Sequence, residues 1–311
     1  MASRLSSGEW HNQGHFPLIG PAMLPRSVKS SAVLFLTLAA LNAHADNFRL
    51  LAVGDVAQCG VPGAYQTANL LARQEGPILV LGDIAYPKGS REDFQRCFDP
   101  AWGRLKARLI PVPGNHEYGT PGAAGYFEYF GAIAGTPEQP WHSRILGNWR
   151  VIGLDSNLKD AAATAQLRWL ADELAANRQT CVLAYFHHPR FSSGEHGDQK
   201  QSDALWRLLA LHHTTLVLAG HDHHYERFAP LDGDARPDTQ GTRSFVVGTG
   251  GAALYPVGKP TGASEFIRNS SWGVLELTLG ADDYRWRYLP VDGGPSPDEG
   301  SGRCALPVPV R

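Results

Sequence analysis

Short apolar runs without internal polar positions recur along most of this 311-residue chain. A strand that is buried on both faces forms such a continuous run, whereas a half-exposed strand alternates between apolar and polar residues. The pattern therefore predicts buried parallel strands at residues 50–53, 78–81, 109–112, 149–154, 181–186 and 215–219. A helix is predicted at residues 164–177, because Leu167, Leu170 and Leu174 recur at helical spacing.

Five of these apolar runs end in a cluster of polar residues. One candidate from each cluster gives the series Asp55, Asp83, Asn115, His187 and His221, with steps of 28, 32, 72 and 34 residues. The shorter steps match the length of one strand-helix-strand unit, and the long step contains a further strand and the predicted helix. Because ligands of open α/β sheets bind beyond the carboxyl ends of the strands, we expect all five side chains along one rim.

The remaining pattern is less regular. Two alternating runs, residues 272–279 and 284–289, predict a hairpin in a second sheet. Residues 244–247 predict another strand, followed by a tight turn at the glycine-rich stretch 248–251. Residues 85–129 are expected to be loop-rich, with aromatic side chains that either wall a substrate site or pack on the sheet edge. The tail after Asp292 is expected to be mobile unless Cys304 ties it down.

The amino-terminal region has the pattern of a secretory signal. Arg26 and Lys29 precede an apolar run at residues 32–41, and the small-x-small sequence Ala43-His44-Ala45 follows it. We expect cleavage after Ala45 and translation from Met23. The protein is then expected to be secreted or periplasmic, with one catalytic domain at residues 46–292, a Pro/Gly-rich tail at 293–311 and no membrane span after signal removal.

Composition narrows the possible partners. The chain is 43% hydrophobic and 19% charged, as in ordinary globular proteins, and its formal net charge is −2. Removal of the signal segment, which carries two more basic than acidic residues, makes the charge more negative. The sequence has no excess of basic residues of the kind that nucleic-acid-binding proteins show. Nothing in it indicates a protein partner.

The four cysteines allow two disulfides in an exported protein, with three possible pairings. Cys59 and Cys97 both lie in loops just beyond polar clusters, so this pair is favoured. Cys181 begins a predicted buried strand, where it can also be a packed free thiol.

The polar clusters have the chemistry of metal ligands. Eight of the thirteen histidines lie between His187 and His224, and His221 and His223 can turn toward one point from a strand-end loop. Carboxylates such as Asp55 and Asp83 suit hard cations, and together with imidazoles they suit iron, zinc or manganese. Taken alone, Asp55, Asp83 or Asn115 would be read as a structural turn residue.

These residues resemble the motifs of the calcineurin-like metallophosphoesterase superfamily, over residues 51–228, and specifically its purple acid phosphatase branch. Superfamily members usually carry Asp-x-His at the first strand end, where this chain has Asp55-Val56-Ala57. Tyr86, in Gly82-Asp83-x-x-Tyr86, compensates as the phenolate that purple acid phosphatases supply to ferric iron. Ala57 departs from that branch, which commonly has Gly at this position.

The resemblance implies a four-layer α/β/β/α sandwich, an α/β fold of two mixed β-sheets flanked by helices. It also implies two metal ions, Fe(III) plus a divalent Fe, Zn or Mn. The first ion would be bound by Asp55, Asp83, Tyr86 and His223, and the second by Asp83, Asn115, His187 and His221. Asp83 would bridge the two. His187 matches the family's His-x-Pro spacing, which leaves its neighbour His188 to contact the ligands or to pack.

The resemblance further implies hydrolysis of phosphate monoesters, as in acid phosphatases, by attack of a metal-activated hydroxide at phosphorus. His116 and His196 are the expected catalytic residues, with Asn115 and Arg190 beside them as substrate-binding residues, and Glu195 is a weaker candidate. The small phosphate-ester substrate is expected to be anionic because the site retains positive charge. The chain lacks a Gly-x-Ser-x-Gly elbow and a Walker-type loop. The alternatives are a phosphodiesterase for nucleotides or phospholipid headgroups, and a non-catalytic protein that binds metal or phosphate.

Overall fold

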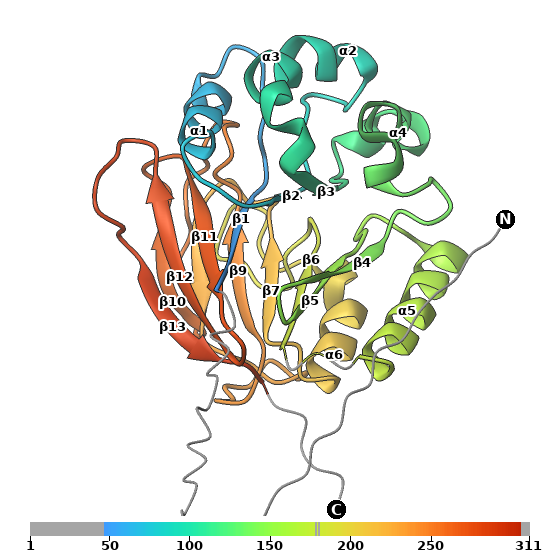
Figure 1. Cartoon of the computed structure of the whole chain (residues 1–311), viewed down its shortest axis with the longest axis vertical. Helices are drawn as coiled ribbons and strands as arrows, with labels where there is room; N and C mark the ends of the chain where they lie inside the picture. The colour runs from blue at the N-terminus through green and yellow to red at the C-terminus, as the bar shows by residue number, and fades with distance from the viewer. Residues whose placement is uncertain (1–46, 178, 180, 306–311) are drawn as a thin grey trace, which may run out of the picture. The chain divides into compact units, whose positions relative to one another are not determined.

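The computed structural model describes residues 47–177, 179 and 181–305. The expected signal segment, Met23 and the last six residues of the tail lie outside the described residues. The described chain forms two mixed β-sheets with helices on the outer side of each (Figure 1). This arrangement confirms the expected α/β/β/α sandwich.

The first sheet combines strands from both ends of the described chain. Its parallel part is made by β1, β2 and β3, and β11, β12 and β13 extend it with antiparallel pairing. The strand order is β13 (Glu299–Arg303), β12 (Asp283–Pro290), β11 (Gly273–Leu279), β1 (Phe48–Val53), β2 (Ile78–Leu81) and β3 (Leu109–Val112).

The second sheet is built from the middle of the chain. Strands β5, β6, β7 and β9 run parallel, and β4, β8 and β10 pair antiparallel at its two sides. The order is β10 (Ser264–Arg268), β8 (Tyr225–Phe228), β9 (Arg243–Val247), β7 (Leu216–Ala219), β6 (Cys181–Tyr185), β5 (Trp149–Gly153) and β4 (His142–Leu146). The five polar clusters therefore follow strands of two sheets and do not lie along the rim of one.

Burial explains why the strands have these sequences. Strands β2, β3 and β7 are buried along their whole length, as the continuous apolar runs predict. Strand β12 alternates instead, with Tyr284, Trp286 and Tyr288 directed into the core and Arg285 and Arg287 directed outward. Aromatic contacts join the sheets across the core, among them Tyr225 against Tyr288 with ring centroids 4.4 Å apart.

Helices close both outer layers. Helix α1 (Gly63–Leu71) packs with α3 (Asp99–Trp102), where the Trp102 indole donates a hydrogen bond to the Ala64 carbonyl. Around them lie α2 (Arg91–Asp93), a π-helical turn (Phe94–Phe98) and α4 (Ala124–Phe130). Helices α5 (Asp160–Ala175) and α6 (Asp203–Leu211) pack on the second sheet through a separate apolar cluster that includes Leu170 and Trp206. None of the helices in the described part of the chain has the length and apolar character needed to cross a membrane.

Two sequence-based expectations need correction, the sheet of the hairpin and the loop-rich character of residues 85–129. The hairpin of β11 and β12 belongs to the first sheet, because β11 pairs directly with β1. The alternation of apolar and polar residues predicted the hairpin but not the strand with which it pairs. Residues 85–129 contain short helices, and aromatic residues such as Trp102, Tyr126 and Phe130 are buried in the core. The glycine-rich stretch 248–251 packs on the loop after β1, where the Gly250 N–H donates to the Gly54 carbonyl.

Both disulfides are now defined. The expected Cys59–Cys97 bond is confirmed. Cys181 is not a free thiol, because it is bonded to Cys304. This second bond joins the start of β6 in one sheet to the residue after β13 in the other. The tail is therefore attached as far as residue 304, by strand pairing and by the disulfide.

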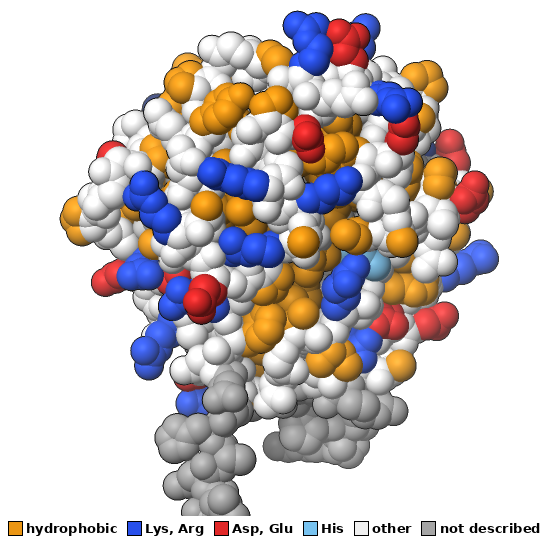
Figure 2. All heavy atoms as spheres, turned by 45° about the horizontal axis from the view of Figure 1, so that its top comes forward, with side chains coloured by type: hydrophobic (Ala, Val, Ile, Leu, Met, Phe, Trp, Pro, Cys, Tyr) orange, Lys and Arg blue, Asp and Glu red, His pale blue; other side chains and the backbone are white. Residues whose placement is uncertain are grey.

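The face that carries helices α1 to α4 is seen in Figure 2. Basic and acidic side chains alternate there with hydrophobic and uncharged surface, in keeping with the nearly balanced total of 28 Lys and Arg against 30 Asp and Glu.

Candidate metal centre

Three of the expected ligands have an unusual backbone conformation. Asp55, Asp83 and His221, which follow β1, β2 and β7, have φ angles of 60°, 49° and 74°. Residues other than glycine adopt this left-handed region rarely, and such conformations concentrate at functional sites. The surrounding packing therefore holds three strand-end turns in a shape that directs these residues toward a common centre.

Two glycines permit this close approach. A Cβ atom on Gly82, which has a φ of 84°, would lie 2.6 Å from the His187 ring. A Cβ on Gly114 would lie 2.1 Å from the Asp83 carboxylate. Only a residue without a side chain leaves room for these ligands, which explains why glycine precedes both polar clusters.

Four side chains form a first group of converging donor atoms. The Tyr86 hydroxyl lies 2.9 Å from His223 Nε2, 3.3 Å from Asp55 Oδ1 and 3.4 Å from Asp83 Oδ2. His223 Nε2 also lies 3.4 Å from Asp55 Oδ1. The members are those that the resemblance implied for the first metal ion.

A second group shares one atom with the first. His187 Nε2 lies 3.0 Å from Asn115 Oδ1, 3.2 Å from His221 Nδ1 and 3.3 Å from Asp83 Oδ2. Asp83 Oδ2 therefore faces Tyr86 on one side and His187 on the other, the position that a bridging ligand requires. The convergence of Asp55, Asp83 and His187 also defines a compact cluster of possible metal ligands.

The atoms of these side chains that face away from the centre are held by hydrogen bonds. His187 Nδ1 donates to the Leu81 carbonyl at 2.9 Å, and His223 Nδ1 donates to the Ala253 carbonyl at 2.6 Å. With Nδ1 engaged in this way, each ring directs Nε2 toward the centre, the orientation that metal-binding histidines usually have. The outer oxygens of Asp83 and Asp55 accept from the backbone N–H groups of His116 and His221.

The electrostatics of the centre favour a cation among these side chains. Burial and the carboxylates of Asp83 and Asp55 raise the pKa of Tyr86 well above its usual value, so its phenolate needs a nearby cation. Burial disfavours the charged forms of both Asp83 and His187. The attraction between the two charged side chains outweighs the effect of burial. It holds the pKa of Asp83 well below its usual range and raises the pKa of His187 to about 9. Two carboxylates, a phenol, an amide and three imidazoles form a mixed oxygen and nitrogen set that fits iron, zinc or manganese.

His116 lies at the edge of this centre. Its Nδ1 donates to the Pro87 carbonyl at 2.6 Å, and its Nε2 lies 3.8 Å from Asp83 Oδ2. The ring packs against Tyr86 with centroids 4.2 Å apart, and about a third of the side chain is exposed. His116 is therefore close to the ligands and open to a substrate.

The loop that contains His196 also reaches the centre. The exposed His196 ring stacks on His221 with centroids 4.5 Å apart, whereas Glu195 is exposed beside it. Arg190 is directed elsewhere, because its guanidinium pairs with Asp203 at 2.8 Å and with Asp198 at 3.7 Å. The structure thus brings His116 and His196 to the ligands and leaves Arg190 in an ion-pair network.

His188 is buried beside the second group. Its Nδ1 and backbone N–H both bond to the Ser156 hydroxyl, and its ring lies 4.5 Å from that of His221. Burial and the adjacent His187 lower the pKa of His188 to about 3, so it is a neutral neighbour of the ligands. Ala57 fits between the loops after β1 and β2, where its N–H donates to the Ile84 carbonyl and its carbonyl accepts from the Tyr86 N–H.

Two buried carboxylates beside the expected ligands were given no role in the sequence analysis. Glu117 accepts from the N–H groups of Ile84, Ala85 and Gly114, so it ties together the loops that carry Asp83 and Asn115. Burial and the charge of Asp83 raise the pKa of Glu117 to about 7. A sequence signal existed, since Glu117 follows Asn115 and His116 directly, but its inward direction depends on the tertiary fold.

The second is Asp222, between His221 and His223. Its carboxylate accepts from the His196 N–H at 2.8 Å and from the Ser192 hydroxyl, and it is fully buried. Asp222 therefore anchors the loop that places His196 over His221.

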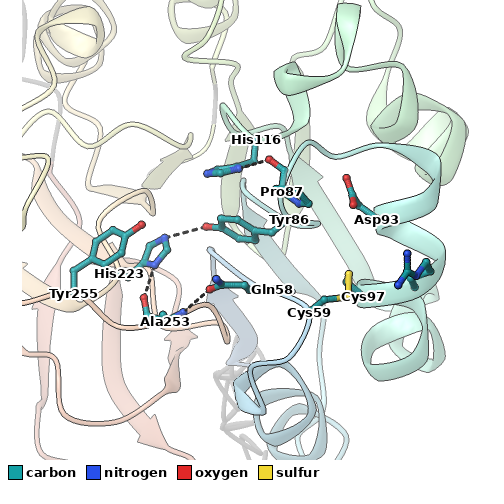
Figure 3. Close-up of a pocket in the computed structure, with 11 residues that line it drawn as sticks. Gln58, Cys59, Tyr86, Pro87, Asp93, Cys97, His116, His223, Ala253 and Tyr255 are labelled. Atoms are coloured by element: carbon teal, nitrogen blue, oxygen red, sulfur yellow. Dashed lines mark hydrogen bonds between the residues drawn. A yellow bond between two sulfur atoms is a disulfide. The ribbon is translucent and has the colours of Figure 1, made fainter.

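A cavity of about 530 Å³ opens beside the first group (Figure 3). Tyr86, His116 and His223 form one end of its wall, and Tyr255 stacks on His223 with ring centroids 3.9 Å apart. A substrate in this cavity would contact the ligand edge directly.

Comparisons with known proteins agree with this geometry. The family model described as calcineurin-like phosphoesterase matches residues 48–225. Tartrate-resistant acid phosphatase type 5 of Sus scrofa is 40% identical over 281 residues, covering 76% of this chain and 77% of that protein. An uncharacterised protein of Mycobacterium tuberculosis is 30% identical over 237 residues, covering 60% of this chain. The match spans only 43% of that mycobacterial protein's length.

Solved structures share the fold. A purple acid phosphatase from yellow lupin (Lupinus luteus) seeds superposes with a TM-score of 0.70 at 18% identity, over 82% of this chain and 53% of that one. A dimetal phosphatase from Danio rerio gives a TM-score of 0.59 at 15% identity, over 83% of this chain and 99% of that one.

Proposed function

Because the chain belongs to the calcineurin-like phosphoesterase family, in its purple acid phosphatase-like branch, we propose that it is a metal-dependent hydrolase of phosphate monoesters. One observation carries this proposal: two groups of donor atoms converge on the shared Asp83 Oδ2. The 40% identity to an acid phosphatase from Sus scrofa supports the same substrate class.

Asp55, Asp83, Tyr86 and His223 would hold Fe(III), and Asp83, Asn115, His187 and His221 would hold a divalent ion. The position of the Tyr86 hydroxyl among Asp55, Asp83 and His223 supports this assignment, because a phenolate there is the ligand that purple acid phosphatases supply to ferric iron. When bound, such a pair supplies Lewis-acid chemistry and lowers the pKa of a water molecule at phosphorus.

The chain's own residues orient the ester and supply the proton. The His116 Nδ1–H donates to the Pro87 carbonyl, so the imidazolium form of His116 would deliver its second proton, on Nε2, to the leaving oxygen and remain as the neutral Nδ1–H imidazole. His196, stacked over His221 and exposed to solvent, is placed to donate to a phosphate oxygen from the opposite side. The amide nitrogen of Asn115 offers a further donor while its Oδ1 faces His187.

Side-by-side kinetics test the substrate class. We expect the metal-loaded protein to hydrolyse p-nitrophenyl phosphate at least tenfold faster, in kcat/KM, than bis-p-nitrophenyl phosphate. A preference for the diester would instead assign the protein to the phosphodiesterases, and no turnover of either would leave it a binding protein.

A spectrum tests the proposed iron. We expect a violet absorption in the purified protein that is lost in Tyr86→Phe while the fold, measured by circular dichroism, is retained. Zinc alone, with no visible band, would contradict the ferric assignment.

We also propose that the protein is exported. Both disulfides, Cys59–Cys97 and Cys181–Cys304, support an oxidising compartment, since such bonds are rare in reducing ones. Fractionation of the producing cells should find the protein outside the cytoplasm, and amino-terminal sequencing should begin at Asp46. A cytoplasmic protein that retains the first 45 residues would contradict export.

A further inference from the structure

One buried histidine beside the second group of donor atoms belongs to neither proposed ligand set. His188 follows the ligand His187 directly, and the family's His-x-Pro spacing leaves the residue at its position unspecified. The side chain of His188 is only 6% exposed. Because buried polar atoms are almost always hydrogen-bonded, both ring nitrogens of His188 need a partner.

The Ser156 hydroxyl sets the tautomer of His188. Ser156 Oγ accepts the backbone N–H of His188 at 3.0 Å and lies 2.8 Å from its Nδ1. Among the described residues, Nδ1 is the one acceptor that this hydroxyl meets. A buried hydroxyl donates its proton where an acceptor is available, so Ser156 donates to Nδ1. The hydrogen-bond network therefore assigns the ring proton of His188 to Nε2.

This Nε2–H group is a donor without a protein acceptor. Within the part of the chain that the structure describes, His188 Nε2 makes no hydrogen bond. The rest of the residue is firmly held, because the Ser202 hydroxyl also donates to the His188 carbonyl at 2.7 Å. An unpaired donor in a side chain that is more than nine-tenths buried is unfavourable unless a ligand accepts from it.

The His188 ring lies against the ligands of the second group. A ring nitrogen from each of His187, His188 and His221 lies within 4.8 Å of the other two. The His221 ring is contacted by the rings of His187, His188 and His196, with centroids 5.0, 4.5 and 4.5 Å away. Two groups that contact the same oxygen at hydrogen-bond distance lie up to about 6 Å apart, so these imidazoles are close enough to surround one phosphate oxygen.

We infer that His188 is a substrate-positioning residue whose Nε2–H donates a hydrogen bond to an oxygen of the phosphate group. The inference rests on the proposed function, because it assumes that the phosphate ester binds at the second group of ligands. A phosphate oxygen there would meet a donor from the protein interior in addition to the exposed imidazole of His196. Because Ser156 orients the His188 ring in advance, the donor needs no rearrangement when the substrate binds.

Two substitutions of His188 separate the donor from the volume of the ring. His188→Phe keeps an aromatic ring and removes the donor, whereas His188→Gln keeps an N–H donor near the position of Nε2. We expect the Kd of inorganic phosphate, measured by calorimetry on metal-loaded protein, to rise about tenfold in His188→Phe, the effect of losing one hydrogen bond to a charged group. In His188→Gln the Kd should stay within about threefold of wild type, because the amide supplies a donor.

The two serines that hold His188 form a matched pair of variants. Ser156→Ala removes the bond that sets the tautomer, so it should raise the Kd of phosphate about threefold. Ser202→Ala removes an equally buried hydroxyl that contacts only the carbonyl of the same histidine, so it should leave the Kd unchanged. Metal content per chain and urea unfolding are measured for every variant.

The outcomes separate this inference from the proposed function. If wild type neither binds phosphate nor hydrolyses phenyl phosphate, the proposed function fails and the inference falls with it. If wild type does both and His188→Phe binds phosphate as tightly, the inference alone is overturned.

Two further results would also overturn the inference alone. Loss of a metal ion in His188→Phe would make His188 a metal ligand, and equal losses of phosphate affinity in Ser156→Ala and Ser202→Ala would show a general loosening of the loop. Weaker phosphate binding in His188→Phe with its metal content retained, restored in His188→Gln, supports the inference.

Discussion

At the scale of single residues, the site depends on backbone conformations that few residues tolerate. Asp55, Asp83 and His221 lie in the left-handed region, and each carries a side chain that a metal ion would bind. Strain of this kind costs about 1 to 3 kcal/mol per residue and persists only where the rest of the fold compensates for it. The sequence indicated these residues as ligands through their position after apolar runs, but burial and backbone angle are properties of the folded chain.

The position of His116 predicts a test of its role as proton donor. His116→Ala should lower kcat for phenyl phosphate by about a hundredfold, the lower end of the range for loss of a general acid. The loss should be smaller for p-nitrophenyl phosphate, because its leaving oxygen needs no proton. Metal content should stay unchanged, because the side chain of His116 is not among the proposed ligands. Equal losses on both substrates would remove His116 from proton transfer.

The buried side chain of His142 leads to a prediction of how stability changes with pH. Burial and the nearby Arg144 lower the pKa of His142 to about 4, and its Nε2 bonds to the Tyr185 hydroxyl. An unfolded histidine takes up its proton near pH 6.5, so the unfolded state binds more protons between pH 6.5 and 4, and stability falls as the pH is lowered through this window. Over the whole window, His142 lowers the free energy of unfolding by about 3 kcal/mol.

Urea unfolding at pH 7.5 and pH 4.5 measures this effect. The loss of unfolding free energy on acidification should be smaller in His142→Gln than in wild type. Because metal release at low pH affects both proteins, the difference between them isolates His142. Identical losses would show that His142 does not contribute.

At the scale of elements, the loops that follow the strands contain the proposed metal ligands, and the buried carboxylates of Glu117 and Asp222 hold these loops in place. The buried strands were predictable to within about two residues, because runs such as β2, β3 and β7 are buried along their whole length and uninterrupted. Strands β4, β8, β10 and β13 were not predicted. The sheet of the β11–β12 hairpin was not predictable, since alternation records one buried face and says nothing about the pairing with β1. Glu117 and Asp222 were missed for the same reason: their partners are distant in sequence.

The loop with His196 gives a prediction at this scale. If Asp222 acts by placing His196, then Asp222→Asn and His196→Ala should each lower kcat about tenfold, and the double variant should be no worse than the worse single variant. The physical reason is that Asp222 accepts the His196 N–H, while the His196 ring stacks on His221. Metal content is the structural control in all three variants. Multiplying losses in the double variant would show that Asp222 acts independently of His196.

At the scale of the whole molecule, the site exists only because two sheets meet. Asp55, Asp83 and Asn115 follow strands of the first sheet, whereas His187 and His221 follow strands of the second. The regular spacing of these residues predicted convergence, but it suggested a single rim, because spacing alone does not reveal where the chain leaves one sheet for another.

The Cys181–Cys304 bond gives a prediction for the packing of the sheets. It closes a loop of 123 residues between the start of β6 and the end of β13, away from the ligands at the strands' carboxyl ends. Replacing both cysteines by alanine should lower the free energy of unfolding by about 2 to 5 kcal/mol and leave kcat nearly unchanged. Urea unfolding and steady-state kinetics check the two statements, and unchanged stability would show that strand pairing alone secures β13.

The central claim is that side chains from both sheets hold two metal ions with Asp83 between them. Elemental analysis of purified, folded wild type and Asp83→Ala, with metal measured per chain, tests it most directly. We expect two ions per chain in wild type and less than one in Asp83→Ala, because Asp83 Oδ2 belongs to both groups of donor atoms. A folded Asp83→Ala protein that retains two ions, or an active wild type with a single ion, would contradict the account.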